Sequence, residues 1–467
     1  MSRPNVIVFF TDQQRWDTTG VHDNPMDLTP NFDRMAQEGT HFYNTFTCQP
    51  VCGPARSVLQ TGKYATSTGV WRNGIGLRPK ERTLAHHFKE AGYTTGYVGK
   101  WHLHGGTEAG PARYAAASND PVPRECQGGY DYWRGSNVLE FVSNAYDFRL
   151  FDEQGLEHRY PGYRVDAQTD LAIRYIDENK DRPFFLFLSY LEPHHQNHAD
   201  AFLAPKGYEE RYRDGWLPPD LQELSGTTAR QLPGYYGCIK RLDEALGRID
   251  DTLTSLDLQE NTIVLYISDH GTHFRTRVGF DKRSGHDSSI RVPCMAKGPG
   301  FDQGGRVKDL FSLVDIPPTL LDAAGVPIPD EMEGQSFFPI VQKRGVAEHD
   351  DVFIQISESG VSRAVRTRKW KYIVLAEGTE GFFDPSGPIF DAPDSDIYTE
   401  SELYDLEYDP YELRNLIGLS AYRPVADRMR ERLLQRVAET EGKNPEIKPA
   451  ATIPSGQSML LAEEVEM

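Results

Sequence analysis

The stretch that organises the chain reads TCQPVCGPARSVLQTG and covers residues 47–62. A glycine and a proline after Cys52 suit a tight turn into a first helical turn, apolar residues then carry a helix inward, and Gly62 ends it. We therefore expect the Cys52 side chain at the positive end of a helix, where backbone N–H groups favour an anion. Arg56 follows four residues later, so its guanidinium can reach the same helix face. A small buried residue at the start of a core helix is the alternative interpretation.

The spacing of Cys52, Pro54 and Arg56 resembles the C-x-P-x-R signature of the type I sulfatases. In that family the cysteine is oxidised after translation to formylglycine, whose aldehyde is hydrated in water, and one hydroxyl of the hydrate is the nucleophile. The resemblance implies that a formylglycine-generating enzyme acts on Cys52. Because so short a pattern is weak support alone, the interpretation depends on further motifs in the family's order.

Composition limits the classes of function. The 467 residues, 38% of them hydrophobic, can bury a large core and predict one large domain plus a smaller one. The formal net charge of 50 − 69 = −19 argues against non-specific binding of nucleic acid or of an anionic membrane. An anionic substrate would therefore need a local positive patch. Five cysteines, an odd number, argue against a disulfide framework.

The apolar segments of the chain indicate the cellular compartment in which we expect the protein. No apolar run approaches the ~20 residues of a membrane span. Residues 5–10, NVIVFF, follow Met1 almost directly and predict a buried strand instead of a signal peptide. The chain as numbered is therefore expected in the cytoplasm, or in the periplasm or outside the cell if an export segment has been removed.

Two predicted core strands end in candidate metal ligands. The first strand ends in Asp12 and Gln13, and a β-branched strand over residues 261–268 ends in Asp269 and His270. A carboxylate just beyond the C-terminal end of a parallel strand lies where α/β sheets bind their ligands. Taken alone, each of these residues more often has a structural role, such as capping a turn.

These strand ends resemble the sulfatase metal site, which usually has two consecutive aspartates where this chain has Asp12 and Gln13. The resemblance implies that one divalent cation is held by Asp12, Gln13, Asp269 and His270. Glutamine can coordinate a hard cation through its amide oxygen but adds no charge. Mostly oxygen ligands favour Ca²⁺ first and Mn²⁺ or Mg²⁺ second.

The sequence GKWHL at residues 99–103 matches a second sulfatase signature residue for residue and follows a predicted short strand. Lys100 and His102 alternate along an extended segment, so their side chains are expected on one side. By resemblance, Lys100 steadies the formylglycine hydroxyls, and His102 takes the proton that lets sulfate leave. A histidine suits that step because its reference pKa is about 6.5.

A strongly apolar strand over residues 183–190 leads to His194, His195 and His198. The Pro-His pair after this strand resembles a family motif whose histidine binds the sulfate and can protonate the leaving oxygen, which assigns that role to His194. The other two histidines are extra. A separate histidine metal cluster is the less favoured alternative, because it would duplicate a carboxylate site better suited to a hard cation.

Residues 273–291 contain the only dense basic stretch of this acidic chain. The segment resembles the family pattern K-x-x-x-Y-E-x-x-I-R-V-P, with Lys282 at the catalytic lysine and His286 and Asp287 in place of Tyr-Glu. By resemblance, Lys282 binds sulfate and assists the leaving group. We further hypothesise that cationic side chains line the pocket mouth and bind a uronate or a second sulfate, namely Arg275, Arg277, Arg283 and His286. A solvated charged face is the alternative.

Residues 1–355 are expected to form a catalytic domain, 356–443 a smaller subdomain with an antiparallel sheet and a helix, and 444–467 a tail without a core pattern. The resemblance implies an alkaline-phosphatase-like α/β fold, with a mostly parallel central sheet flanked by helices. Residues 105–162 lack clean periodicity and are interpreted as an insertion over the ligand edge of that sheet. Its aromatic residues suit sugar rings, namely Tyr130, Tyr132 and Trp133.

Together these motifs favour a sulfuric ester hydrolase that removes sulfate from a sulfated saccharide. Attack by a hydroxyl derived from Cys52 would be supported by Arg56, Lys100 and the cation, while His194 and Lys282 assist departure of the alcohol. A phosphonate monoester or phosphodiester hydrolase is the first alternative, since relatives with the same nucleophile also carry Asp-Gln at the metal position. An inactive glycan-binding relative is the second. Oligomeric assembly is left open.

Overall fold

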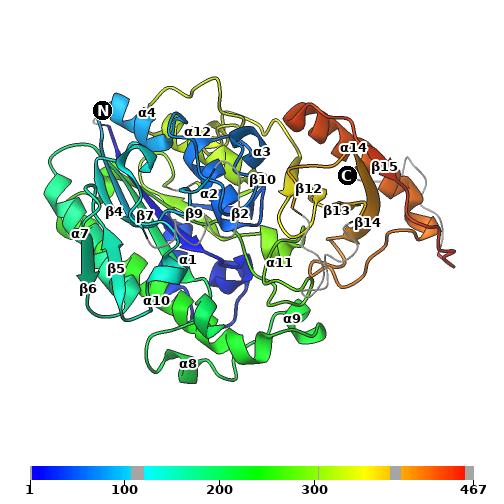
Figure 1. Ribbon diagram of the computed structural model, residues 1–467, viewed down its shortest axis with the longest axis horizontal. Helices are drawn as coiled ribbons and strands as arrows, with labels where there is room; N and C mark the ends of the chain where they lie inside the picture. Colours follow the sequence, from blue (N-terminus) through cyan, green and yellow to red (C-terminus); the bar gives the residue numbers. More distant parts are fainter. Residues whose placement is uncertain (1–2, 107–119, 303, 379–390, 458–467) are drawn as a thin grey trace.

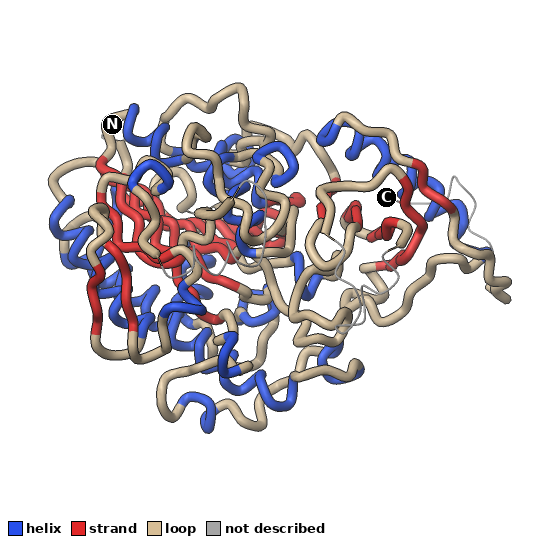
Figure 2. The backbone as a smooth tube through the Cα atoms, viewed as in Figure 1, coloured by secondary structure: helices blue, strands red, loops and turns tan. Residues whose placement is uncertain are grey.

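The computed structural model describes residues 3–106, 120–302, 304–378 and 391–457. A ten-stranded sheet crosses the larger part of the molecule, and a five-stranded sheet lies beside it (Figure 1, Figure 2). The large sheet has the strand order β10 (Gly305–Ser312), β2 (Thr40–Phe46), β9 (Cys294–Lys297), β8 (Thr262–Ser268), β1 (Asn5–Asp12), β7 (Phe184–Pro193), β3 (Thr94–Lys100), β4 (Tyr132–Ser136), β5 (Phe148–Phe151) and β6 (Glu157–Tyr160).

Helices cover both faces of this sheet, as the alternation along β1 requires. Val6, Val8 and Phe10 belong to the core formed with α2 (Cys52–Thr61), α4 (Leu84–Glu90) and α12 (Ile316–Ala323). Ile7 and Phe9 point to the opposite face and the core formed with α1 (Pro30–Glu38), α7 (Arg164–Asn179) and α10 (Thr228–Ser255). Every residue of β1 is buried, which explains its continuous apolar run.

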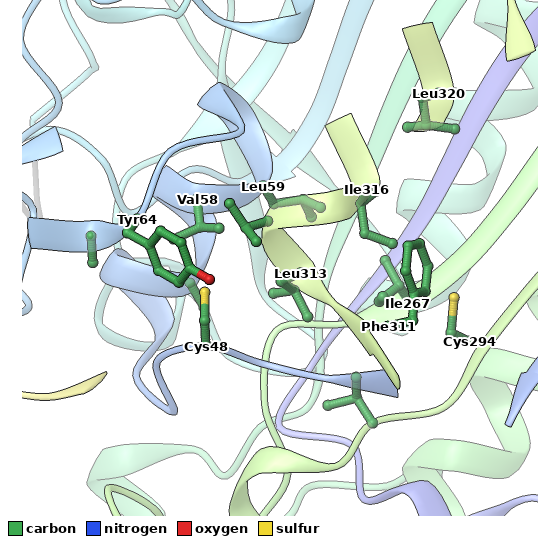
Figure 3. Close-up of a cluster of buried hydrophobic side chains, with 14 of the residues drawn as sticks. Cys48, Val58, Leu59, Tyr64, Ile267, Cys294, Phe311, Leu313, Ile316 and Leu320 are labelled. Carbon is green, nitrogen blue, oxygen red and sulfur yellow. The ribbon is translucent and has the colours of Figure 1, made fainter. Parts of the chain in front are cut away.

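The core beneath α2 fixes the helix that begins at Cys52. Val58 and Leu59 of α2 lie beside Leu313 and Ile316, as Figure 3 shows, and all four side chains are fully buried. Burial of each such side chain contributes roughly 1.5–3 kcal/mol to folding. The inner face of α2 is therefore held by packing, while its first turn faces the edge of the sheet.

The five strands at the centre of the sheet, β8, β1, β7, β3 and β4, run parallel. β1 pairs in parallel with β7 and β8, and β3 pairs in parallel with β7 and β4. Their C-terminal ends therefore meet at one edge, where the candidate motifs follow each strand. The outer pairings of β9 with β2 and β8, and of β5 with β4 and β6, are antiparallel.

The segment interpreted as an insertion instead contributes three strands of the sheet, within its described residues 105–106 and 120–162. Tyr130 and Trp133 are fully buried, and Trp133 stacks on Tyr97 with ring centroids 4.9 Å apart. Tyr132 packs against Tyr175 at 5.1 Å. The expectation that these aromatic residues suit sugar rings is therefore wrong for Tyr130 and Trp133, because both belong to the core.

The second sheet has the order β11 (Asp351–Ile356), β12 (Ser362–Thr367), β13 (Trp370–Ala376), β14 (Ile397–Asp405) and β15 (Glu446–Lys448). The first four strands pair antiparallel, and α14 (Arg423–Glu441) packs on them through Val425, Met429 and Leu433 (Figure 1). The expected boundary at residue 355 falls inside β11, and part of the expected tail forms β15, parallel to β14.

Short helices complete the described part of the chain. These are α3 (Ala65–Thr68), α6 (Leu139–Val142), α8 (Tyr208–Arg211), α9 (Pro219–Glu223), α11 (Asp287–Ile290) and α13 (Phe338–Val341). Within the described ranges, no helix combines the length and the apolar character that crossing a bilayer would require.

Candidate active site

The predicted helix at Cys52 is confirmed. α2 starts at Cys52 after Val51 in an extended conformation and ends at Gly62, which adopts a left-handed φ of 71°. Its first turn is tied to a neighbouring loop, since the Gly53 N–H donates to Asn73 Oδ1 at 2.9 Å. The Cys52 side chain therefore lies where the helix dipole favours a negative charge.

Three groups from distant parts of the chain surround the Cys52 sulfur. Asp12 Oδ1 lies 3.5 Å from Sγ, His270 Nε2 lies 3.2 Å away, and Lys282 Nζ lies 3.0 Å away. Cys52 itself is 1% exposed. The strand ends of β1 and β8 thus meet the start of α2 in one buried cluster.

Arg56 joins the two carboxylates of this cluster. Its Nη2 lies 2.9 Å from Asp12 Oδ2, and its Nε lies 3.5 Å from Asp269 Oδ2. The same guanidinium donates to the Lys100 carbonyl and to Ser189 Oγ. Arg56 therefore holds the ends of three strands in place from one position on α2.

The cluster fits a divalent cation. Asp12, Cys52, Asp269 and His270 each offer a ligand atom, and these atoms lie within 4.8 Å of one another. Asp269 Oδ2 is buried without a hydrogen-bond partner among the described residues. His270 Nδ1 lies 2.9 Å from the Gly271 carbonyl and donates to it, so Nε2 carries the lone pair that a metal would use.

The two aspartates differ in their electrostatics. Burial raises the pKa of Asp12, but the charges of Lys100, His194 and Arg56 outweigh that effect and hold its pKa well below the usual range. Burial and the neighbouring Asp12 carboxylate raise the pKa of Asp269 to about 6. A cation between them would favour the ionised form of both.

Gln13 lies beside the cluster in a left-handed conformation with φ of 72°. Its backbone N–H donates to Asp269 Oδ1 at 3.0 Å. Its amide oxygen lies 3.3 Å from Lys282 Nζ, and its amide nitrogen donates to Thr272 Oγ1. The amide oxygen therefore faces the cluster, and coordination by Gln13 stays a prediction.

Lys100 ends β3 and enters the same cluster. Its Nζ lies 2.8 Å from Asp12 Oδ2 and 2.9 Å from Glu140 Oε1. The preceding Gly99 has a φ of 116°, and a Cβ there would lie 1.8 Å from the Ser189 carbonyl oxygen. Only glycine fits this approach of β3 to β7, which explains the first residue of the GKWHL motif.

The expected alternation of Lys100 and His102 does not hold, because His102 adopts a left-handed φ of 57° after the end of β3. Its backbone N–H donates to the Asn137 carbonyl at 2.7 Å. Burial, followed by the charge of Lys100, lowers the pKa of His102 to about 3. His102 is thus a neutral imidazole at neutral pH.

His194 follows the end of β7 and is 6% exposed. Its Nδ1 lies 2.6 Å from the His195 carbonyl and donates to it, which leaves the lone pair on Nε2. Burial and the charge of Lys282 lower the pKa of His194 well below its usual range. The His195 ring stacks on that of His194 with centroids 4.8 Å apart. Neither His195 nor His198 joins a group of metal ligands among the described residues.

Comparisons with known proteins decide the family. A sequence model of the sulfatase family matches residues 4–326, and one for the C-terminal region of N-sulphoglucosamine sulphohydrolase matches residues 277–383. The chain belongs to the sulfatase family. An ulvan-active sulfatase of Formosa agariphila is 30% identical over 455 residues, which cover 94% of this sulfatase and 82% of the relative. An arylsulfatase of Clostridium perfringens is 29% identical, with 94% and 95% covered.

Solved structures confirm the expected fold class. A protein of glycosaminoglycan metabolism in Bacteroides thetaiotaomicron superposes with a TM-score of 0.81 at 22% identity, over 94% of this chain and 97% of that one. A structure in complex with D-glucosamine-2-N,6-O-disulfate superposes with a TM-score of 0.74 at 22% identity, over 95% and 99%. Because both identities are low, these two similarities support the fold of this sulfatase and nothing beyond it.

In this sulfatase, Cys52 lies in a strongly charged environment. Burial and the Asp12 carboxylate raise the pKa of the Cys52 thiol, but the charges of Lys100, Lys282 and His270 outweigh them and lower it to about 7. A helix start and these cations together favour negative charge at residue 52.

The four residues expected at the pocket mouth have protein partners. Arg275 pairs with Asp200 and Asp281, and Arg283 pairs with Glu358. The other two face the C-terminal subdomain. Arg277 donates to the carbonyls of Tyr411 and Glu412, and His286 Nε2 lies 2.9 Å from Glu402 Oε2. The structure does not bring these four side chains together with the Cys52 cluster, and their role in substrate binding stays a prediction.

Sequence reasoning missed two residues of this site. Ser189 Oγ accepts from Arg56 and donates to the Lys100 carbonyl, and Glu140 binds Lys100. Ser189 lies inside a continuous apolar strand, where a single serine gives no signal. Glu140 follows β4, whose few residues lie in the segment without clean periodicity. A carboxylate shortly after a strand would have been the signal for it.

Proposed function

We propose that this sulfatase removes sulfate from a sulfated saccharide through a formylglycine made from Cys52 and with the help of a divalent cation. The observation that supports this most is the convergence of Asp12, Asp269, His270 and Lys282 on Cys52 within a few ångströms. The oxidised residue would supply a hydroxyl nucleophile, and the cation, which we assign as Ca²⁺ because the ligands are mostly oxygen atoms, would lower the pKa of that hydroxyl and polarise the sulfate oxygens. Four segments of the chain build this one site.

The protein's own side chains surround the position where charge develops. Lys100 and Lys282 bring two ammonium groups to the cluster, and Arg56 fixes the carboxylates behind it. Fixed cations in a buried site stabilise a developing negative charge better than water does. His102 is unprotonated at neutral pH, and Nε2 of His194 carries a lone pair that is available to the substrate.

The test combines two measurements on the protein made together with a formylglycine-generating enzyme. Mass spectrometry of the peptide containing Cys52 should show the lower mass of the aldehyde. Release of sulfate from a panel of defined sulfated saccharides should be abolished in Cys52→Ala. An unmodified thiol in active protein would contradict the proposed nucleophile. An unmodified thiol with no activity on any ester would instead support an inactive glycan-binding relative.

The proposal of a saccharide substrate is supported by relatives that are named for saccharide substrates. An ulvan-active sulfatase is 30% identical, and an N-acetylglucosamine-6-O-sulfatase of Bacteroides thetaiotaomicron is 24% identical over 94% of this chain. The saccharide panel identifies the sugar and the sulfate position. An aryl sulfate cleaved with a higher kcat/KM than every saccharide would contradict this part of the proposal.

A phosphonate monoester or phosphodiester hydrolase is the second candidate, and Gln13 is the observation that favours it. Its neutral amide at the metal position leaves the site with one negative charge fewer than two aspartates would give. The ratio of kcat/KM for an aryl sulfate to that for an aryl phosphonate monoester separates the two. A ratio above one supports the sulfatase activity, and a ratio below one supports the second candidate.

A further inference from the structure

Glu140 is buried beside Lys100 and lies outside the group of candidate metal ligands. Its Oε1 lies 2.9 Å from Lys100 Nζ, and its side chain is 3% exposed. Lys100 has a second carboxylate partner in Asp12, at 2.8 Å. We propose that Glu140 is the positioning residue that holds the Lys100 ammonium in its place beside residue 52. This inference rests on the proposed function of the site.

The two carboxylates around Lys100 are not equivalent. Asp12 also binds Arg56 and lies 3.5 Å from the Cys52 sulfur, so its charge is shared among several groups. Within the described ranges, Lys100 is the one side chain that Glu140 binds, and Glu140 Oε2 has no hydrogen-bond partner. Lys100 is therefore the ion-pair partner of Glu140, although the Glu140 charge also acts on the nearby His102 ring.

The backbone of Glu140 is fixed by groups that do not touch the ammonium. Gln196 Nε2 donates to the carbonyls of Glu140 and Ser143, and Arg164 ties Gln196 to Glu192 through contacts of 3.4 and 2.7 Å. The turn α6 is thus anchored to the segment that carries His194. Loss of the Glu140 charge would leave these supports in place.

The loops that bear Lys100 and Glu140 are also joined directly. The Trp101 N–H donates to the Ser136 carbonyl, and the His102 N–H donates to the Asn137 carbonyl. The distance between the two side chains is therefore set by paired backbone. Without the Glu140 charge, Asp12 alone holds the ammonium, which then pivots about the Asp12 carboxylate and away from the place it occupies between the two carboxylates. A shift of about 1 Å at a reacting centre can cost about 100-fold in rate.

A double-mutant cycle tests the assignment. Glu140→Gln keeps the shape and removes the charge, and it should lower kcat on the wild type's best sulfate ester by about 10- to 100-fold, with KM changed by less than about threefold. In the Lys100→Met background the same substitution should change kcat by less than about twofold. Glu153→Gln, which removes a carboxylate paired with Arg134 at the surface, is the matched control and should leave kcat unchanged.

Two further measurements test the same assignment of Glu140 as the residue that positions Lys100. Glu140→Asp restores the charge on a shorter stem and should have a kcat nearer to the wild type than Glu140→Gln has. Crystal structures of the wild type and of Glu140→Gln should show Lys100 Nζ displaced by about 1 Å. An equal loss of kcat in both backgrounds, an unchanged kcat, or an unmoved Lys100 would each overturn the assignment. If the wild type releases no sulfate from any ester, the proposed function fails, and the crystal structures still decide whether Lys100 depends on Glu140.

Discussion

The ammonium of Lys282 lies 3.0 Å from the sulfur of Cys52, although 230 residues separate them in the chain. The same ammonium lies 3.1 Å from His270 Nε2 and 3.3 Å from the amide oxygen of Gln13. Lys282 therefore joins the cluster through Cys52, His270 and Gln13, whereas Lys100 joins it through Asp12.

Replacement of Lys282 by methionine should lower kcat/KM for sulfate release by about 10²- to 10³-fold, because one fixed cation near the developing charge is lost. The melting temperature and the formylglycine content of residue 52 should stay close to those of the wild type. Steady-state kinetics and mass spectrometry of the same preparation check this. An unchanged kcat/KM would show that the Lys282 ammonium does not act on the reaction.

Removal of the cation should lower both activity and stability. Two buried carboxylates, Asp12 and Asp269, then face each other without it. A ligand at 100 times its Kd adds about 2.7 kcal/mol to the free energy of unfolding. Dialysis against a chelator should therefore lower the melting temperature, and Ca²⁺ should restore it.

Asp269→Asn should weaken this response to Ca²⁺, and metal analysis should find less bound metal in that variant than in the wild type. A wild-type melting temperature that does not respond to Ca²⁺, Mn²⁺ or Mg²⁺ would contradict the metal site.

Asp315 should make stability depend on pH. It accepts N–H groups from Ser312 and Gln335, yet burial raises its pKa to about 7. Because this folded value lies above the unfolded value of about 3.9, its contribution to stability is complete below about pH 4 and is lost as the pH rises to about 7. The free energy of unfolding of the wild type, minus that of Asp315→Asn, should fall by at least about 1 kcal/mol between about pH 5 and 8. Urea unfolding at several pH values measures it, and a difference independent of pH would refute it.

The ionic contacts between the second sheet and Asp287 of α11 should be costly to break. Lys371 of β13 is fully buried and binds Asp287 and Glu412, and Arg366 also binds Asp287. Lys371→Met would leave buried carboxylates with too few cations, which costs about 3–5 kcal/mol. The neighbouring Lys369→Met is the control, since its ion-pair partner Glu407 is 60% exposed, so that the loss should cost less than about 1 kcal/mol. Equal losses in chemical denaturation would contradict this difference.

The parts of the fold that the sequence predicts are those whose pattern is local. The strand that ends at Asp12 is buried on both faces and appears as a continuous apolar run. The helix at Cys52 has its turn residues at the start and Gly62 at the end. Since parallel strands bring their C-terminal ends to one edge, the meeting of Asp12 with Asp269 could also be expected.

The parts of the fold that the sequence does not predict depend on contacts with residues far away in the chain. β4 is short, and the environment of Trp133 is set by stacking on Tyr97. Glu140 has no motif of its own, and its place beside Lys100 follows from the pairing of β3 with β4. β15 is three residues long and exists through its pairing with β14. The left-handed turn at His102 likewise follows from contacts with residue 137 and not from the extended pattern.

The burial of Cys52 limits the time at which another enzyme can oxidise its thiol. The sulfur is enclosed by residues that the ribosome adds long after residue 52, and the backbone N–H of Gln355, still later, donates to the Cys48 carbonyl. Another enzyme could reach the thiol only before these segments close over it, so oxidation would have to precede the completion of folding. A fully folded thiol form should therefore stay unmodified when the oxidising enzyme is supplied afterwards, and unfolding the chain should restore its reactivity toward that enzyme.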